Sequence, residues 1–385
     1  MQLRADWNYP TSVRFGSGRI AELADAVKAA GMARPLFVTD PNLARLPMAA
    51  DALASLRAAG LAVEAFGDIR PNPVESNIAA GVAAFTVGGH DGVVAFGGGS
   101  ALDAGKLIAF MTAQVRPVWD FEDVGDWWTR ANAAGIAPVV AVPTTAGTGS
   151  EVGRAAVVTN ESTHTKKIIF HPRMMPKIAI CDPALTLGMP RLVTAGTGMD
   201  ALAHCLEAYC TSFYHPLADG IAAEGVRLVK ENLARAVNDG SDLNARAHMM
   251  AAAAMGATAF QKGLGAIHAL SHPVGALYDT HHGLTNGVFM PYVLAFNRSI
   301  IESRIKRLAA YIGLRPTFRA FLDWVIELRA AIGVPPTLAG LNVSDEHIDR
   351  IVAMAVEDPT AGGNPRPFDK RAARTIFKRA LEGRM

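Results

Sequence analysis

The sequence predicts an α/β N-terminal half with a mostly parallel sheet, followed by an all-α C-terminal half. Its 385 residues exceed what one hydrophobic core usually holds, which favours two domains. The first half alternates short apolar runs with amphipathic stretches, the pattern of repeated strand, helix, strand units. After about residue 190 the sequence changes to Ala, Leu and Met at helical spacing, with few β-branched clusters.

Five apolar runs in the first half are predicted as buried strands, because each ends in turn or polar residues. Amphipathic helices are predicted between them, for example over residues 20–31 and 48–60. The five predicted strands cover residues 35–40, 60–69, 91–100, 137–145 and 177–185.

The second half contains long amphipathic patterns, including residues 218–237 and 300–313. The most apolar run, residues 249–260, is too short to cross a bilayer and is predicted as a buried helix. A Gly- and Pro-rich loop over residues 358–369 precedes a final helix.

The composition is that of a compact protein, with 50% hydrophobic and 19% charged residues. A net charge of +2 with scattered Lys and Arg gives no nucleic-acid or membrane-surface footprint. Cys181, Cys205 and Cys210 have no CxxC spacing and suit free thiols in a reducing compartment. The N-terminus lacks the basic start and apolar stretch of a signal peptide, so we expect a cytoplasmic protein.

Two glycine-rich runs follow predicted strands. VVAFGGGSALDAGK, at 93–106, places Gly97, Gly98, Gly99 and Ser100 between a strand and a helix start, where N–H groups and the helix dipole favour an anion. The alternative is a plain turn, because GGGS lacks the GxGxxG spacing. VPTTAGTGSE, at 142–151, follows a neighbouring strand, and the pair predicts a Rossmann-like dinucleotide site.

Asp40 closes the strand PLFVTD, where a carboxylate can accept hydrogen bonds from ribose hydroxyls. Such a carboxylate would repel a 2′-phosphate, which favours NAD over NADP. Since Pro41 follows, the alternative is that Asp40 begins a turn.

Asp200 and His204 lie in the predicted helix GMDALAHCLEAY, four residues apart and therefore on one face. They would converge on a metal ion, or form an ordinary hydrogen bond inside a helical core. Cys205 is not expected to be a ligand, because adjacent helical residues point about 100° apart.

A second segment, GLGAIHALSHPVGALYDTHHGLTNG, holds His268, His272, His281 and His282, four of the chain's 11 histidines. This concentration favours a divalent transition metal such as Fe(II) or Zn(II). Pro273 disfavours helical geometry at His272, which is expected near a helix end, and His282 is expected in a loop. Four protein ligands, with room for a substrate oxygen, would be Asp200, His204, His268 and His282.

PTTAGTGSE, GMDALAHCLEAY, GLGAIHALSHPVG and HHGLTNG together resemble the iron-containing (group III) alcohol dehydrogenases, from about residue 10 to the GGNPR near 362. The resemblance implies the same four metal ligands and a non-ligand histidine at His272. It also implies NAD contacts at Asp40, Asn72, Gly97, Gly98, Gly99, Ser100, Asp103, Thr144, Thr145 and a lysine that best matches Lys167.

Three positions depart from the family pattern or leave it ambiguous. Gly153 stands where the family often has Thr, and His281 where several members have Pro or another residue. Lys167 adjoins Lys166 in a stretch of variable length, so that assignment is ambiguous by one residue.

The resemblance implies metal-assisted hydride transfer between a small alcohol and NAD, giving an aldehyde or ketone. We expect His272 to relay the released proton, the alternative being a partner that orients a ligand. Arg154 and Lys262 would bind an anionic substrate such as 4-hydroxybutyrate if both face the cleft. Otherwise Arg154 serves an interdomain contact, and Lys262 caps a helix or faces solvent.

The expected organisation is an NAD-binding domain over 1–188, a metal-binding domain over 189–385, and an active site in the cleft between them. This arrangement also resembles dehydroquinate synthases and glycerol dehydrogenases, so a dehydroquinate synthase-like architecture is expected and a lyase is the main rival function. By resemblance, a homodimer or larger homo-oligomer is expected.

Overall fold

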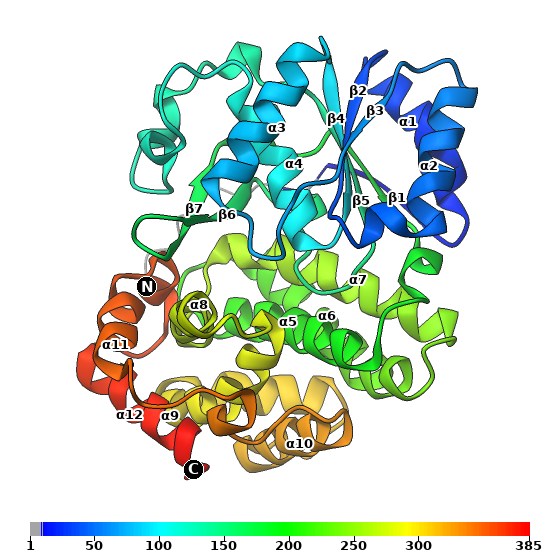
Figure 1. Cartoon of the computed structure of the whole chain (residues 1–385). Coiled ribbons are helices and arrows are strands. Elements are labelled where there is room, and N and C mark those ends of the chain that lie inside the picture. The colour runs from blue at the N-terminus through cyan, green and yellow to red at the C-terminus, as the bar shows by residue number, and fades with distance from the viewer. Residues whose placement is uncertain (1–8, 10) are drawn as a thin grey trace. The chain divides into compact units, whose positions relative to one another are not determined.

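The computed structural model describes residues 9 and 11–385, which form two compact units (Figure 1). The α/β unit consists of Tyr9–Thr145 and Gly149–Thr186, and the helical unit of Ala146–Thr148 and Leu187–Met385. The predicted order, an α/β half followed by an all-helical half, is confirmed. Part of the second glycine-rich run, Ala146–Thr148, belongs to the helical unit.

The α/β unit is built on a six-stranded sheet in which every pairing is parallel. Each predicted run contains one of its strands. In spatial order the strands are β1 (Ser12–Phe15), β8 (Ile178–Cys181), β5 (Val139–Pro143), β4 (Gly92–Gly97), β2 (Pro35–Val38) and β3 (Glu64–Phe66).

Both faces of this sheet are buried, which explains why its central strands are apolar without alternation. Leu36 and Val38 pack on one face with helices α3 (Glu75–Val87) and α4 (Gly99–Met111). Phe37 points to the other face, where helices α1 (Leu23–Ala29) and α2 (Pro47–Ala58) complete a second core. The covering helices thus fix the carboxyl ends of the strands.

Three strands are not among those the sequence predicts. β1 is an edge strand with exposed Val13 and Phe15, so its short run shows no buried pattern. β6 (Ala155–Asn160) and β7 (Thr165–Phe170) form a separate antiparallel pair. In β7 every residue but one is only partly buried, which hides the strand from a search for apolar runs.

The helical unit is arranged around α5 (Arg191–Cys210), which is buried along most of its length. Helix α5 packs against α6 (Pro216–Asn238), α7 (Leu243–Ala259) and α9 (His282–Tyr311). None of the described helices is both long and apolar enough to cross a lipid bilayer. The remaining α-helices are α8 (Ala266–Tyr278), α10 (Phe318–Ala331), α11 (Ile348–Glu357) and α12 (Lys370–Glu382).

Two local predictions in this unit are wrong. Helix α8 continues through Pro273, so His272 lies within the helix and not near its end. A proline inside a helix removes one backbone hydrogen bond, and burial of Pro273 offsets that loss through packing. His282 is not in a loop but is the first residue of α9, with His281 as its N-cap.

Candidate functional site

The first glycine turn joins β4 to α4 in the α/β unit. Gly97 has φ +150°, and a Cβ there would lie 2.7 Å from the Ala101 Cβ, so the turn requires glycine. Gly98 is the N-cap and provides no side-chain cap, while the Ser100 hydroxyl donates to the Pro71 carbonyl. The first N–H groups of α4 have no partner within the helix and favour an anion such as a dinucleotide phosphate.

Asp40 follows β2, the strand beside β4. From this pair the chain continues in opposite directions across the sheet, to β3 and to β5, and open α/β sheets bind ligands at such a reversal. Asp40 Oδ1 accepts hydrogen bonds from the N–H groups of Asn42 and Leu43 at 2.9 and 3.0 Å. A Cβ at Gly97 would lie 3.8 Å from Oδ2. One oxygen therefore begins a turn while the other lies near the glycines, so the two predicted roles of Asp40 are compatible.

The second glycine-rich run lies against the first turn, because β4 and β5 are parallel neighbours and end at the same edge. The Thr144 N–H donates to the Gly97 carbonyl at 2.9 Å. A Cβ at Gly98 would lie 3.5 Å from Thr145 Oγ1. The structure thus brings the two threonines to the same place as the glycines.

Asp103 is buried in α4 and uses both carboxylate oxygens within the protein. Oδ1 accepts from Ser150 Oγ at 2.5 Å, and Oδ2 accepts from the Val157 N–H at 2.9 Å. Lys106 Nζ lies 3.2 Å from Oδ1 and also donates to the Ser150 carbonyl at 3.0 Å. Through these contacts Asp103 connects α4 to the second glycine-rich run. A contact between Asp103 and NAD stays a prediction.

The structure separates the two adjacent lysines of β7. Lys166 Nζ donates to Asn72 Oδ1 at 2.9 Å, which joins it to another predicted cofactor residue. Successive strand residues point to opposite sides, and Lys167 Nζ donates to Glu122 Oε2 at 3.0 Å. The contact with Asn72 favours Lys166 over Lys167 as the lysine of the cofactor set.

The helical unit brings together the four residues predicted as metal ligands, and we call them the histidine cluster. Asp200 and His204 lie one turn apart on α5, His268 lies on α8 and His282 begins α9. Asp200 Oδ1 is 3.5 Å from His282 Nε2 and 3.7 Å from Nε2 of both His204 and His268. The first three residues are buried, with ligand atoms within 4.8 Å of one another.

These distances fit a divalent cation. Four donor atoms arranged tetrahedrally at bond lengths of about 2.1 Å would be about 3.4 Å apart, close to the observed separations. A carboxylate with three imidazoles also suits iron or zinc in its donor chemistry.

Asn286 lies at the centre of the histidine cluster. Its Nδ2 donates to Asp200 Oδ1 at 2.8 Å and lies 3.3 Å from His268 Nε2 and 3.2 Å from His282 Nε2. Its Oδ1 is buried and has no hydrogen-bond partner among the described residues. The Asp200 oxygen and the two histidine nitrogens thus surround one point, which the positively polarised amide group of Asn286 occupies. Such an arrangement is expected of a site that binds a cation.

The electrostatics of the histidine cluster favour positive charge. Burial would raise the pKa of Asp200, but its three histidine neighbours hold that pKa far below its usual range. Burial would lower the pKa of His268, whereas hydrogen bonds to Asp200 and Glu207 raise it to about 9. Burial is the largest influence on His204 and lowers its pKa to about 4. The ring is therefore neutral at pH 7 and can donate a nitrogen lone pair to a metal ion.

His272 lies beside the cluster with its ring stacked on His282, at 5.3 Å between centroids. Its Nδ1 is 2.8 Å from Asp358 Oδ2, and Asp358 Oδ1 accepts from the Thr360 N–H at 2.9 Å. Burial would raise the pKa of Asp358, but His272 and Thr360 lower it overall. The ionised carboxylate therefore holds the Nδ1–H of His272 and leaves Nε2 as the acceptor.

Three residues of this site are missing from the sequence-based set: Glu207, Asn286 and Asp358. Helical spacing contains a signal for two of them, because Glu207 lies seven residues after Asp200 and Asn286 four after His282. Asp358 gives no local signal, since it lies 86 residues from His272 in sequence.

The two predicted substrate residues differ in their surroundings. Lys262 is buried, and its Nζ pairs with Asp219 and lies 3.5 Å from the Tyr209 carbonyl, which indicates a structural role. Arg154 is partly exposed, with its guanidinium 5.4 Å from the Phe170 ring centroid.

The predicted free thiols are buried. The Cys205 Sγ donates to the Ala252 carbonyl at 3.8 Å, and burial raises its pKa to about 12, so it is a poor ligand.

Comparisons with known proteins cover nearly the whole chain. The sequence profile for iron-containing alcohol dehydrogenases matches residues 10–183, and that for the C-terminal part of the Fe-containing alcohol dehydrogenase family matches residues 194–381. The chain is 36% identical to a 4-hydroxybutyrate dehydrogenase from Cupriavidus necator, covering 98% of this chain and 99% of that protein. It is 34% identical to a 1,3-propanediol dehydrogenase from Citrobacter freundii, covering 98% of each.

A solved structure of a 1,3-propanediol oxidoreductase superposes with a TM-score of 0.93 at 34% identity, covering 98% of this chain and 100% of that one. Both halves of the chain match the family. The chain therefore belongs to the iron-containing alcohol dehydrogenase family.

Proposed function

We propose that this alcohol dehydrogenase interconverts a small alcohol and its aldehyde or ketone at the histidine cluster, with NAD(H) as the hydride carrier. The observation that supports this most is the convergence of one carboxylate oxygen and three imidazole Nε2 atoms within 3.7 Å of it. A divalent cation held there would act as a Lewis acid on the substrate oxygen, and NAD would accept the hydride.

The residues around the cluster have separate tasks in this proposal. Asp200, His204, His268 and His282 hold the cation. His272 takes the proton released during alcohol oxidation on Nε2, because Asp358 holds its Nδ1–H. That the active site lies in the cleft between two domains divided at residue 188 stays a prediction.

Metal dependence is the first test. Asp200→Ala should lose bound metal in elemental analysis, and turnover should fall by a factor of roughly 1,000 or more because the buried imidazoles lose their anionic partner. His248→Ala is the matched control, since His248 lies on α7 in the same unit and contacts the Asn244 carbonyl. Full metal content and turnover in Asp200→Ala would contradict the proposal.

The reaction class is tested by product analysis. A dehydrogenase forms NADH in proportion to the alcohol consumed, whereas a synthase of the dehydroquinate type returns its NAD oxidised. A screen on protein reconstituted separately with Fe(II) and Zn(II) would identify the active metal. Absence of NADH across a broad alcohol panel would overturn the function.

For the cofactor we propose NAD over NADP, supported by the Asp40 carboxylate beside the first glycine turn. Asp40→Asn removes the negative charge while preserving the size of the side chain. We expect the ratio of kcat/KM for NAD to that for NADP to fall at least several-fold, and an unchanged ratio would contradict this role.

An anionic substrate is the second candidate, favoured by the partly exposed Arg154 and by the similarity to a 4-hydroxybutyrate dehydrogenase. Lys262 does not support it, because Asp219 pairs with that ammonium. Comparing kcat/KM for 4-hydroxybutyrate and n-butanol, in wild type and Arg154→Leu, tests it. A preference for butanol in the wild type would exclude the anion.

We also propose a cytoplasmic homo-oligomer. Three reduced, buried cysteines support the location, and the exposed Val13 and Phe15 on edge strand β1 support self-association. Light scattering of the purified protein tests the assembly, and a monomer at micromolar concentration would contradict it.

A further inference from the structure

Glu207 is a buried carboxylate that is not among the predicted metal ligands. It lies on α5 three residues after His204, with only 6% of its surface exposed. A buried carboxylate requires hydrogen-bond donors to offset its lost hydration. The partners of its two oxygens therefore show its role.

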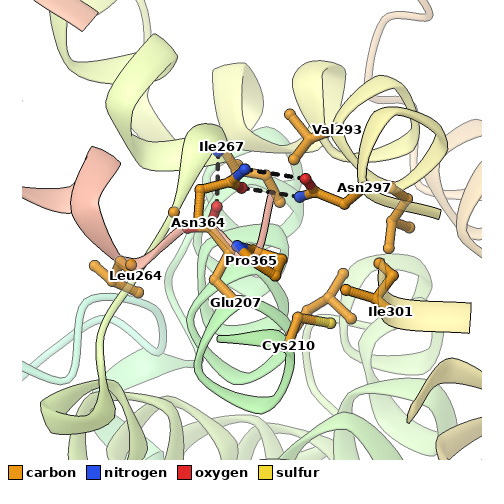
Figure 2. A pocket seen from close by; sticks show the side chains of 13 residues that line it. Glu207, Cys210, Leu264, Ile267, Val293, Asn297, Ile301, Asn364 and Pro365 are labelled. Atoms are coloured by element: carbon orange, nitrogen blue, oxygen red, sulfur yellow. Dashed lines mark hydrogen bonds between the residues drawn. The ribbon is translucent and has the colours of Figure 1, made fainter. Parts of the chain in front are cut away.

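The two oxygens bind adjacent residues of α8. Oε1 accepts from the Ile267 N–H at 2.7 Å, a bond that Figure 2 shows at the edge of a small cavity. Oε2 accepts from His268 Nδ1 at 2.6 Å. One carboxylate thus contacts both the backbone and a candidate metal ligand of the same helix.

The first of these bonds caps α8 from a different helix. Ile267 is the second residue of α8, and its N–H has no partner within the helix. The N-cap, Gly265, has no side chain, and a Cβ there would lie 3.0 Å from Glu207 Oε1. Glycine at this position lets the carboxylate reach the helix start.

A second cap comes from the loop before α12. Asn364 Oδ1 accepts from the Ala266 N–H at 3.3 Å, and Asn364 exchanges two hydrogen bonds with Asn297 of α9. Figure 2 shows this amide pair beside Glu207. Asn364 and Glu207 both accept hydrogen bonds at the N-terminus of α8, but of the two only Glu207 is hydrogen-bonded to His268.

The second bond fixes the histidine. Because Nδ1–H donates to the carboxylate, Nε2 is the ring nitrogen of His268 that faces Asp200 Oδ1, 3.7 Å away, and it is the nitrogen left to bind a cation there. A charge-assisted hydrogen bond of this kind also makes the imidazole a stronger donor to a metal.

We propose that Glu207 is a positioning residue that sets the tautomer of His268 and, through the same carboxylate, the place of the helix that bears it. This rests on the proposed function, because it assigns a metal to His268. Its consequence is that metal affinity depends on Glu207 although Glu207 is not a ligand.

The test is Zn(II) affinity, measured by competition with a chromophoric chelator on the full chain freed of metal. In Glu207→Gln the amide has one carbonyl oxygen, so it can accept from Ile267 or from His268 but not from both. We expect the Zn(II) Kd to rise by roughly 10- to 100-fold, with binding at one equivalent retained.

Asn364→Ala is the matched control, because it removes a cap of the same helix without touching His268. Its Zn(II) Kd should stay within about threefold of wild type, even if its metal-free Tm falls as far as that of Glu207→Gln. Glu207→Asp retains the charge but is too short to reach both donors, and it replaces Glu207→Gln if that variant does not fold.

Two outcomes would overturn the inference alone. The first is a wild-type Kd in the Glu207 variants, and the second is an equal loss in Asn364→Ala, which would make Glu207 only a helix cap. A wild-type chain that binds no Zn(II) would overturn both this inference and the proposed function.

Discussion

The glycine turns of the α/β unit and the histidine cluster of the helical unit are built from different parts of the chain. The turns offer backbone N–H groups at strand ends, where glycine permits close approach. The cluster offers side chains from three long helices, held by further side chains. Substitutions in the turns should therefore act through backbone shape, and those in the cluster through the loss of particular donor atoms.

The two regions also differ in how they treat a buried carboxylate. Burial raises the pKa of Glu151, in the second glycine-rich run, to about 7, because its own backbone N–H and Lys106 compensate only in part. Burial acts on Asp200 in the same direction, yet three histidines lower its pKa. The surroundings of Glu151 thus destabilise its ionised form, whereas the surroundings of Asp200 stabilise its ionised form.

Among substitutions that leave the four metal ligands intact, the largest effect should come from the backbone of the first turn. Gly97→Ala places a Cβ 2.7 Å from that of Ala101 at φ +150°, so the turn must shift. We expect KM for NAD to rise roughly 100-fold, about 2.7 kcal/mol, while metal content is unchanged. Gly220→Ala, in α6 with no atom within 4 Å of the added Cβ, should behave as wild type. Loss of metal in Gly97→Ala would contradict the expectation that substitutions in the glycine turns affect cofactor binding and leave the metal site unchanged.

Glu151→Gln tests whether burial of the ionised Glu151 carboxylate lowers the stability of the folded protein. The folded pKa of Glu151 is about 7 against 4.5 in the unfolded chain, so the folded state binds the proton more tightly. The wild type therefore loses stability as pH rises from about 4.5 to 7, and the variant lacks this term. Urea denaturation should show Glu151→Gln gaining roughly 2 kcal/mol relative to wild type between pH 5 and pH 8. A difference that does not vary with pH would contradict the assignment.

The histidine cluster should respond to the loss of a single acceptor. Asp358→Ala removes the partner of His272 Nδ1, and we expect kcat to fall roughly 10-fold with metal content retained. Thr360→Val is the control, because it removes a hydrogen bond to the other Asp358 oxygen without touching His272. Equal losses in both variants would indicate a loop defect.

Local patterns in the sequence are enough to predict the parallel sheet, the helical half and the pair Asp200 and His204. Each depends on periodicity or on residues close in sequence, such as Asp200 and His204 one turn apart. His268 and His282 enter through their concentration in one segment and through the family resemblance. The order of the strands in the sheet is not predicted, because strand pairing depends on contacts between residues far apart in the chain.

The errors and omissions have tertiary causes. Packing keeps α8 helical through Pro273, against the local preference of the residue before proline. Asp358 meets His272 only because the loop before α12 folds back onto α8. Asn286 and Glu207 have the helical spacing expected of residues near the predicted ligands. The sequence does not show which face of each helix is buried, so it does not distinguish these two residues from polar residues exposed to solvent.

The smallest effect, and the sharpest for the cofactor region, should separate Lys166 from Lys167. Strand periodicity places them on opposite sides of β7 but does not tell which side faces a cofactor. The structure joins Lys166 to Asn72 at 2.9 Å, and pairs Lys167 with Glu122 at 3.0 Å in a partly exposed ion pair. Such pairs contribute about 0–1 kcal/mol to stability.

Lys166→Ala should therefore raise KM for NAD several-fold, because it removes a cation beside Asn72, while Lys167→Ala should leave KM within about twofold of wild type. Steady-state kinetics of the two single variants at saturating alcohol give both values, and each variant serves as the control for the other. If Lys167→Ala had the larger effect, the position matched through the family resemblance would hold against the one indicated by the contact with Asn72. The side of β7 that faces the dinucleotide would then be the side of Glu122.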